Sequence, residues 1–290
     1  MKLQRSTFQL LRLHFSFFLM PVYWFALSQV GTRDWPRAIL IFFILHILVY
    51  PASNGYNSYM DRDTSPIGGL EHPLQPTRQL FRLTMGMDVL ALLLGLLVGP
   101  WFTLGLALYI LASRAYSYRG IRLKKYPIIG YLTVIICQGG LVFFLVFNGS
   151  QVHTSFEVPP ETMIAMIASS LLIGGFYPLT QLYQHEADRK DGVKTISLLL
   201  GYRGSFIFTA IVYTFAFLLL AYSFIATLQI KEFEVLATCM LPVLVYFFIW
   251  ALKVWRDPAQ ANFVNTMRMN LLASVCINAG FIMVTWMNNY

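Results

Sequence analysis

Long apolar segments alternate with short polar connections along almost the whole chain. Nine of these segments come close to the roughly 20 apolar residues that a helix needs to cross the core of a bilayer. They span 13–31, 38–57, 83–100, 101–117, 127–147, 162–183, 205–228, 234–254 and 266–287. Gly99 and Pro100 separate the third segment from the fourth, so we expect these two to form a tight helical hairpin. The pattern predicts an all-α integral membrane protein with nine transmembrane helices.

The composition favours a membrane protein and argues against most other classes. Apolar residues make up 57% of the 290 residues and charged residues only 12%, whereas soluble proteins carry roughly 25% charged residues. Too little polar surface remains to cover a water-soluble fold, which argues against a cytosolic enzyme, a coiled coil or a disordered chain. The three cysteines lie in apolar stretches, as small buried side chains do. We expect a single membrane-embedded domain over 1–290, made of two halves at about 1–126 and 127–290.

The basic residues predict how the chain is oriented. Nine spans place the connections alternately on the two sides of the membrane, and 18 of the 21 Lys and Arg residues then fall on one side. Because positively charged loops stay in the cytoplasm, the N-terminus is predicted to be cytoplasmic and the C-terminus external. The first segment follows basic residues, as in a signal peptide, but no small-residue cleavage site is evident and we expect a retained helix. We expect a multi-pass protein of a bacterial inner membrane with its active site facing the cytoplasm.

Two acidic stretches on the cytoplasmic side repeat one pattern. They follow the second and the sixth apolar segments, and each has Tyr, then Asn or Gln, then three residues before an Asp-Arg pair. Positions four apart share one face of a helix, so Asn57 with Asp61, and Gln184 with Asp188, should point the same way. The repeat indicates that the two stretches serve one site.

Carboxylates at a membrane edge point to a cation. They are costly near a bilayer and are kept mainly for function. Two facing acidic clusters also repel each other unless a cation lies between them, and oxygen ligands favour Mg²⁺, which keeps waters and bridges to phosphates. The candidate metal ligands are Asp61, Asp63, Glu186, Asp188 and Asp191. The alternative is local pairing with Arg62 and Arg189, although adjacent helix residues point apart.

Basic residues on the same side suit a diphosphate. The connection after the fourth segment holds five Lys or Arg in the twelve residues 114–125, and Arg122 and Lys124 are the candidates. An ordinary membrane-flanking anchor is the alternative. A loop rich in Gly and Pro follows the first acidic stretch and leads to Arg78. This loop is equally compatible with a lid, with Arg78 as a further phosphate contact, and with a passive connector.

Taken together, these features resemble the UbiA superfamily of intramembrane prenyltransferases over nearly the whole chain. The resemblance rests on the nine spans, on the two acidic motifs, and on the segment with Tyr116, Ser117, Arg122, Leu123 and Lys124. It implies a fold in which nine transmembrane helices surround a central cavity.

The acidic motifs depart from the family pattern at three positions. Ser58 and Ser65 stand where the first motif usually has acids, and Gln184 stands where the second usually begins with Asp. Thr195 and Gly201 continue the second motif as in the family. The departures leave the carboxylates that the chemistry needs.

The resemblance also implies an activity. Relatives of this kind transfer a prenyl group, with Mg²⁺, from an isoprenyl diphosphate to a lipophilic, aromatic or quinone-precursor acceptor, and release diphosphate. Asp61 and Asp188 are then the catalytic residues. The residues expected to bind substrate are Asn57, Arg78, Tyr116, Arg122, Lys124, Gln184 and Lys194. The expected partners are the isoprenyl diphosphate, a lipophilic acceptor and the lipid bilayer, with no nucleic acid.

Two other functions compete with this one. A terpene cyclase of the same superfamily acts on a prenyl diphosphate without a second substrate, and the altered first motif favours it slightly. Transporters often show inverted repeats with charges near the bilayer midplane. Here the repeat is parallel and its charges lie at one edge, which argues against transport. Asp88, near the start of the third segment, is interpreted either as an ion-pair partner of Arg82 or as an acid that lines the site.

Overall fold

The computed structural model of the protein describes residues 3–152 and 158–288. Lys2, one of the basic residues counted on the cytoplasmic side, lies outside these ranges. Within them every regular element is helical, and two isolated bridges, Arg33–Gln151 and Ile67–Leu70, are the β-type pairings. The all-helical architecture predicted from the apolar pattern is confirmed.

The helices follow the apolar segments closely. In chain order they are α1 (Arg5–Leu11), η1 (Leu13–Leu19), α2 (Met20–Ser28), α3 (Trp35–Phe43), η2 (Ile44–Val49), α4 (Tyr50–Asp61), α5 (Arg78–Val98), α6 (Pro100–Ser117), η3 (Leu123–Lys125), α7 (Pro127–Val134), η4 (Ile135–Leu141), α8 (Val142–Gly149), α9 (Pro160–Thr180), η5 (Leu182–Gln184), α10 (His185–Lys190), α11 (Ile196–Ala226), α12 (Ile230–Arg256), η6 (Pro258–Gln260) and α13 (Phe263–Met287).

Within the described residues, eight helices or continuous helix runs are long and apolar enough to cross a membrane. They are Arg5–Ser28, Trp35–Asp61, Arg78–Val98, Pro127–Gly149, Pro160–Lys190, Ile196–Ala226, Ile230–Arg256 and Phe263–Met287. The predicted fourth span forms α6 but is not among the eight, because Ser113, Arg114 and Ser117 make its last turns polar. The count of nine and the orientation stay predictions.

Several spans contain a local break that shapes the interior. Arg12 ends α1 in the left-handed conformation, with φ of 49°, and Pro178 lies near the end of α9, just before the chain tightens into η5. The segments η2 and η4 are π-helical, a form often found at functional sites. In η4 the backbone passes so close to α9 that a Cβ on Gly139 would lie 2.4 Å from the Cα of Ser170. Only glycine fits there.

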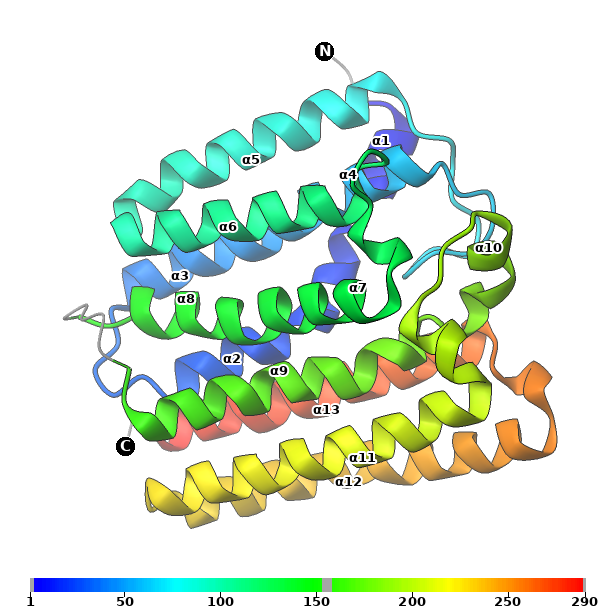
Figure 1. The fold of residues 1–290 in the computed structure, drawn as a ribbon. Coiled ribbons are helices and arrows are strands. Elements are labelled where there is room, and N and C mark those ends of the chain that lie inside the picture. The colour runs from blue at the N-terminus through cyan, green and yellow to red at the C-terminus, as the bar shows by residue number, and fades with distance from the viewer. Residues whose placement is uncertain (1–2, 153–157, 289–290) are drawn as a thin grey trace.

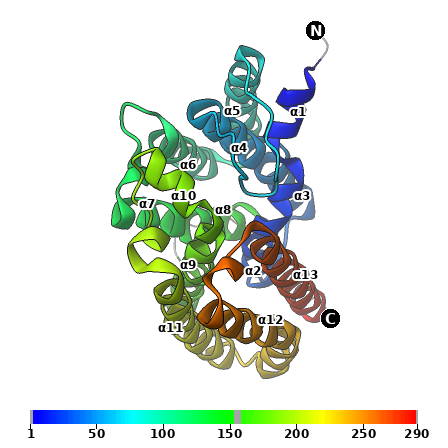
Figure 2. The same cartoon turned by 90° about the vertical axis from the view of Figure 1, so that its right-hand side faces the viewer.

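The long helices run side by side, as Figure 1 shows, and Figure 2 views them from the end that carries α10. Helices α5 and α6 form the hairpin predicted at Gly99, whose φ is 153°. Helix α11 packs along α9, and α13 packs against both α12 and α2. The outer helix faces expose large apolar side chains, such as Leu97 at 69% and Phe215 at 60%, which identifies an integral membrane protein.

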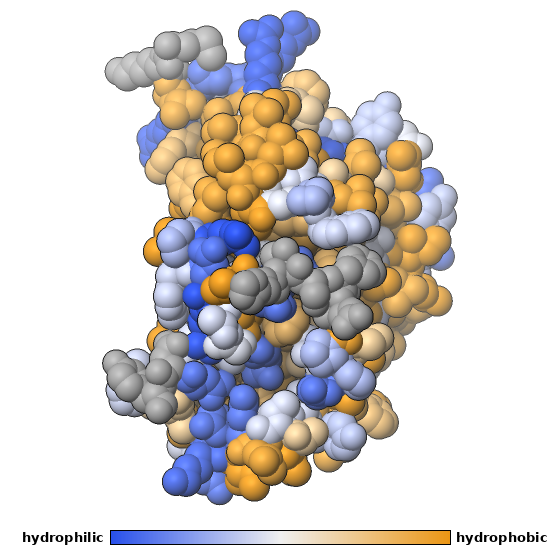
Figure 3. Space-filling model, turned by 90° about the vertical axis from the view of Figure 1, so that its left-hand side faces the viewer, coloured by the Kyte–Doolittle hydropathy of each residue, from blue (hydrophilic) through white to orange (hydrophobic). Residues whose placement is uncertain are grey.

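The two ends of the helices differ in what they carry. The ends of α4 and α6 and the short helix α10 lie together at the right-hand end of Figure 1. The opposite end, seen face-on in Figure 3, carries a group of adjoining hydrophobic side chains in its upper part and a mixture of hydrophilic and hydrophobic side chains below them. The acidic motifs of the two chain halves therefore meet at one end of the molecule.

Candidate functional site

A cavity of about 240 Å³ lies where the two acidic motifs meet. Its walls come from both halves of the chain, including α4, the loop after it, α6, α9, α10 and α13. The residues predicted from the sequence that line it are Asn57, Asp61, Asp63, Tyr116, Lys124, Gln184, Asp188 and Asp191. The fold thus brings most of the predicted site residues together.

Helix α4 presents the first motif to the cavity. Asn57 and Asp61 are four residues apart on this helix, and both face the cavity. Arg62 ends the helix in the left-handed conformation, with φ of 56°, so Asp61 occupies its last turn. Asn57 donates a hydrogen bond to Ser117 Oγ of α6, at 2.9 Å, which holds the ends of these two helices together.

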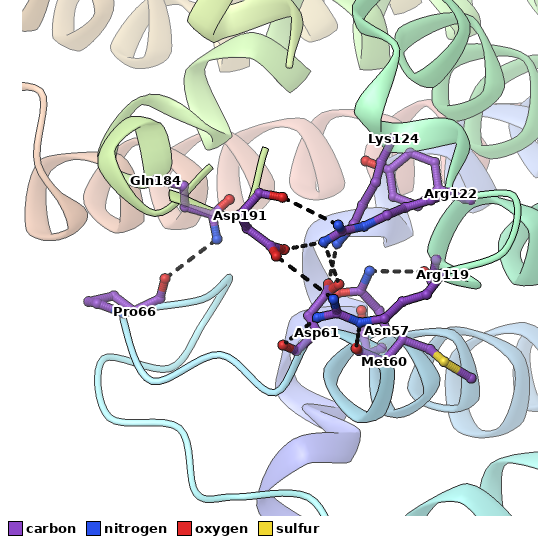
Figure 4. A network of polar contacts seen from close by, with 12 residues as sticks. Asn57, Met60, Asp61, Pro66, Arg119, Arg122, Lys124, Gln184 and Asp191 are labelled. Carbon is purple, nitrogen blue, oxygen red and sulfur yellow. Dashed lines mark hydrogen bonds and ion pairs between the residues drawn. The ribbon is translucent and has the colours of Figure 1, made fainter. Parts of the chain in front are cut away.

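The basic segment after α6 lies between the two acidic motifs (Figure 4). Lys124 pairs with the Asp61 carboxylate, whose side chain is only 3% exposed. Arg122 pairs with Asp191 of the second motif, and its Nη2 lies 3.6 Å from Asp61 Oδ1. Arg119 donates to the Met60 carbonyl oxygen at 2.7 Å. In this structure, the positive charge between the two acidic motifs therefore comes from the side chains of Lys124 and Arg122.

The second motif lies on η5 and α10, beyond the break near Pro178. Asp188 accepts a hydrogen bond from Thr195 Oγ1 at 3.3 Å. Gln184 donates to the Pro66 carbonyl oxygen at 3.4 Å, so it connects the second motif to the loop that follows α4. This hydrogen bond holds the loop against the cavity.

Four predicted residues are not among those that line the cavity. Arg122 is one of them, although it pairs with Asp191 and lies near Asp61; the others are Glu186, Arg78 and Lys194. Glu186 is two residues before Asp188 and points away from it, with a side chain 81% exposed and bonded to Lys190 Nζ at 2.7 Å. We therefore remove Glu186 from the candidate metal ligands. Arg78, the first residue of α5, and Lys194 are exposed and do not line the cavity, so their predicted contacts with substrate have no support in the structure.

The structure also adds site residues that the sequence did not indicate. Arg12, which we counted only as a membrane-flanking cation, is 7% exposed, lines the cavity and donates to the Gly68 carbonyl oxygen at 3.1 Å. The buried residues Gln181 and Asn270 line the cavity as well. Gln181 lies three residues before Gln184 of the second motif, whereas Asn270 lies on α13, far from both motifs in the sequence.

The site carries more negative charge than its ion pairs neutralise. Asp63 lines the cavity but makes no hydrogen bond or ion pair with any described residue. Burial and the nearby Asp61 carboxylate raise the pKa of Asp63 above its usual range. Asp61 Oδ1 is buried without a hydrogen-bond partner. These carboxylate oxygens are a donor set that suits a hard cation.

The arrangement fits a magnesium ion that is shared with a phosphate. Among the described residues, no three acidic, His or Cys side chains converge closely enough to form a complete protein cage for a metal. Mg²⁺ commonly binds through one or two carboxylates, keeps waters and takes its other ligands from substrate phosphates. Asp61, Asp63 and Asp188 are the residues that could hold it in this way.

Known proteins resemble the chain in sequence and in fold. The model of the UbiA prenyltransferase family matches residues 18–272. The chain is 29% identical over 175 residues to the bacteriochlorophyll synthase 33 kDa chain of Cereibacter sphaeroides, which covers 58% of this chain and 56% of that protein. It is also 29% identical over 166 residues to the 1,4-dihydroxy-2-naphthoate octaprenyltransferase of Bacillus subtilis, covering 53% and 52%. The matched parts thus span about half the length of these relatives.

Solved structures share the fold over almost the whole chain. A UbiA homologue from Archaeoglobus fulgidus, bound to DMAPP and Mg²⁺, superposes with a TM-score of 0.72 at 19% identity, covering 97% of this chain and 99% of that one. The apo UbiA homologue from Aeropyrum pernix K1 gives a TM-score of 0.68 at 18% identity, covering 93% and 97%. Since the family model spans most of the chain and the acidic motifs line one cavity, the protein belongs to the UbiA prenyltransferase family.

Proposed function

We propose that the protein transfers a prenyl group from an isoprenyl diphosphate to a lipophilic acceptor with an aromatic or quinone-precursor ring, in the presence of Mg²⁺. One observation carries the proposal: acidic motifs from both chain halves line a single cavity, with Lys124 and Arg122 between them. The names of the two curated relatives, a bacteriochlorophyll synthase and a naphthoate prenyltransferase, support an aromatic acceptor. The predicted orientation would place the site at the cytoplasmic face of a bacterial inner membrane.

The charged end of the cavity would bind the diphosphate. Asp61, Asp63 and Asp188 would hold Mg²⁺, which neutralises negative charge on the diphosphate and so makes it a better leaving group. Lys124 and Arg122 would contact the remaining oxygens, since ammonium and guanidinium groups bind phosphate well. Asn57 and Gln184, which line the same end, supply uncharged hydrogen bonds.

In the transfer step, the bond between prenyl C1 and the diphosphate oxygen breaks, and its electron pair leaves with the diphosphate. The prenyl C1 forms a new bond to a ring carbon of the acceptor, and that carbon then loses its proton to solvent. Positive charge on the allylic carbon is stabilised by the faces of aromatic rings. Tyr116 and Tyr177 line the cavity and are hydrogen-bonded to each other, so their rings are held in place for this purpose.

The test is diphosphate release by the purified, detergent-solubilised protein with geranylgeranyl diphosphate, with and without Mg²⁺ and an aromatic acceptor. We expect release only when both are present, and its loss in Asp188→Asn. Glu186→Gln is the matched control, because this carboxylate lies two residues away but outside the cavity. Release without acceptor, together with a cyclic product, would support the terpene cyclase instead. Equal activity of the Asp188 variant and the wild type would contradict the proposed site.

A further inference from the structure

The wall of the cavity formed by α9 and α13 contains two buried amides. Gln181 caps the C-terminal end of α9 and is 6% exposed, and Asn270 lies on α13 and is 2% exposed. Both line the cavity. Gln181 Oε1 and Asn270 Oδ1 are buried without any hydrogen-bond partner among the described residues. A buried polar atom left unpaired costs free energy, so two of them on one cavity wall indicate a ligand that pairs with them.

The neighbour of Gln181 on α9 is Tyr177, one turn earlier. The Tyr177 hydroxyl is hydrogen-bonded to Tyr116, and the Gln181 side chain lies close to it. The Gln181 oxygen still has no partner. An amide oxygen only accepts hydrogen bonds, so the missing partner must be a donor.

The two amides lie at different levels of the cavity. Gln181 caps α9 just before η5, beside the second motif, whereas Asn270 lies farther from that end. Asn270 follows the start of α13 by seven residues, which is about 10 Å along a helix. The charged side chains that bind each other, Asp61, Lys124, Arg122 and Asp191, gather at the mouth where the motifs meet. If these charged side chains bind the diphosphate, the reacting carbon lies in the cavity beside them, and an acceptor must meet it there.

We propose that Gln181 and Asn270 form the subsite that binds the acceptor, by accepting hydrogen bonds from hydroxyl groups on its aromatic ring. The inference rests on the proposed function and adds the chemistry of its second substrate: an uncharged, hydroxylated ring. Two amide oxygens pair with O–H donors and repel a carboxylate. Hydrogen bonding of this kind holds the ring in place. It also makes the ring more electron-rich, and therefore a better nucleophile toward the prenyl carbon.

Kinetics of two variants and one control test the subsite. Gln181→Met and Asn270→Leu remove the amides while keeping side-chain size, and we expect each to raise the KM for 1,4-dihydroxynaphthalene about tenfold with little change in the KM for geranylgeranyl diphosphate. Asn278→Leu is the matched control. Asn278 is also buried on α13, with its oxygen unpaired, but it does not line the cavity. An equal effect of Asn278→Leu and Asn270→Leu would show that the amide at Asn270 is only structural, and would overturn the proposal.

A second measurement needs only the wild-type protein. 1,4-Dimethoxynaphthalene keeps the ring but lacks the hydroxyl donors, so we expect its kcat/KM to be at least tenfold lower than that of the dihydroxy compound. Equal use of the two acceptors would overturn the subsite while leaving prenyl transfer established. No transfer to any hydroxylated ring would overturn the proposed function, and the subsite with it. In Gln181→Met/Asn270→Leu, the preference for the hydroxylated acceptor should disappear.

Discussion

Asp88 and Arg114 form a buried ion pair between α5 and α6, and breaking it should cost more stability than removing it entirely. The side chains are 10% and 14% exposed, and Arg114 Nε lies 3.0 Å from Asp88 Oδ2. Removing one partner leaves the other charge unpaired in an apolar environment, which costs about 3–5 kcal/mol. We therefore expect Asp88→Leu and Arg114→Leu each to destabilise the protein by about this amount.

The double variant should be much less destabilised than the sum of the two single variants. It leaves no unpaired charge and loses only the other contacts of Arg114, which lies over the ring of Tyr56 at 4.2 Å and donates to the Ala52 carbonyl oxygen at 3.4 Å. These contacts contribute roughly 1–2 kcal/mol. With these magnitudes the double-mutant cycle should give a coupling energy of at least about 4 kcal/mol.

The cycle can be measured by unfolding with sodium dodecyl sulfate in mixed micelles, followed by tryptophan fluorescence. Arg37→Met is the control, because Arg37 pairs with Asp34 at 3.1 Å but is 34% exposed, so its pair should contribute less than about 1 kcal/mol. Additive effects of the Asp88 and Arg114 substitutions would refute the reasoning. Because Ala52 and Tyr56 lie on α4, the Arg114 variant should also raise the KM for the prenyl diphosphate.

Three further predictions concern the charged end of the cavity. Lys124→Met should abolish activity, since it removes the ion-pair partner of the buried Asp61, whereas Lys125→Met, which changes an exposed neighbour, should keep most of it; diphosphate release measures both. Ser117→Ala removes the hydrogen bond from Asn57 and should weaken binding of the prenyl diphosphate by up to about tenfold in a titration with a fluorescent analogue. EDTA should stop diphosphate release, and added Mg²⁺ should restore it, while circular dichroism stays unchanged; a protein that remains active in EDTA contradicts the expected metal dependence.

The helical architecture and the location of the site could be predicted from local patterns. Apolar runs of bilayer length predicted the long helices, and the four-residue spacing of Asn57 and Asp61 correctly placed both on the cavity face of α4. The structure places the Glu186 side chain outside the cavity, for a reason that spacing also explains. Positions two apart on a helix face different directions, so Glu186 could not point with Asp188.

Contacts that cross between distant segments could not be predicted in this way. Asp88 pairs with Arg114, which is 26 residues away across the hairpin, and not with Arg82 on its own helix. Gln181 and Asn270 line one cavity because α9 and α13 both border it. Gln181 lies close to the second motif in the sequence, but nothing in the local pattern around Asn270 separates it from a residue that packs in the core.

Gln184 shows how the structure changes the meaning of a sequence difference. In the sequence it takes the place of an acid of the second motif and resembles a lost metal ligand. In the structure its amide donates a hydrogen bond to the Pro66 carbonyl oxygen, which no carboxylate can do.

If a ligand were missing, Gln184→Asp would lower the Mg²⁺ concentration needed for half-maximal activity. We expect the opposite result: Gln184→Asp should lose the connection to Pro66, make the loop after α4 more sensitive to limited proteolysis, and reduce activity. A gain in Mg²⁺ affinity with unchanged proteolysis would show that the position acts as a ligand site and that the hydrogen bond to Pro66 is dispensable.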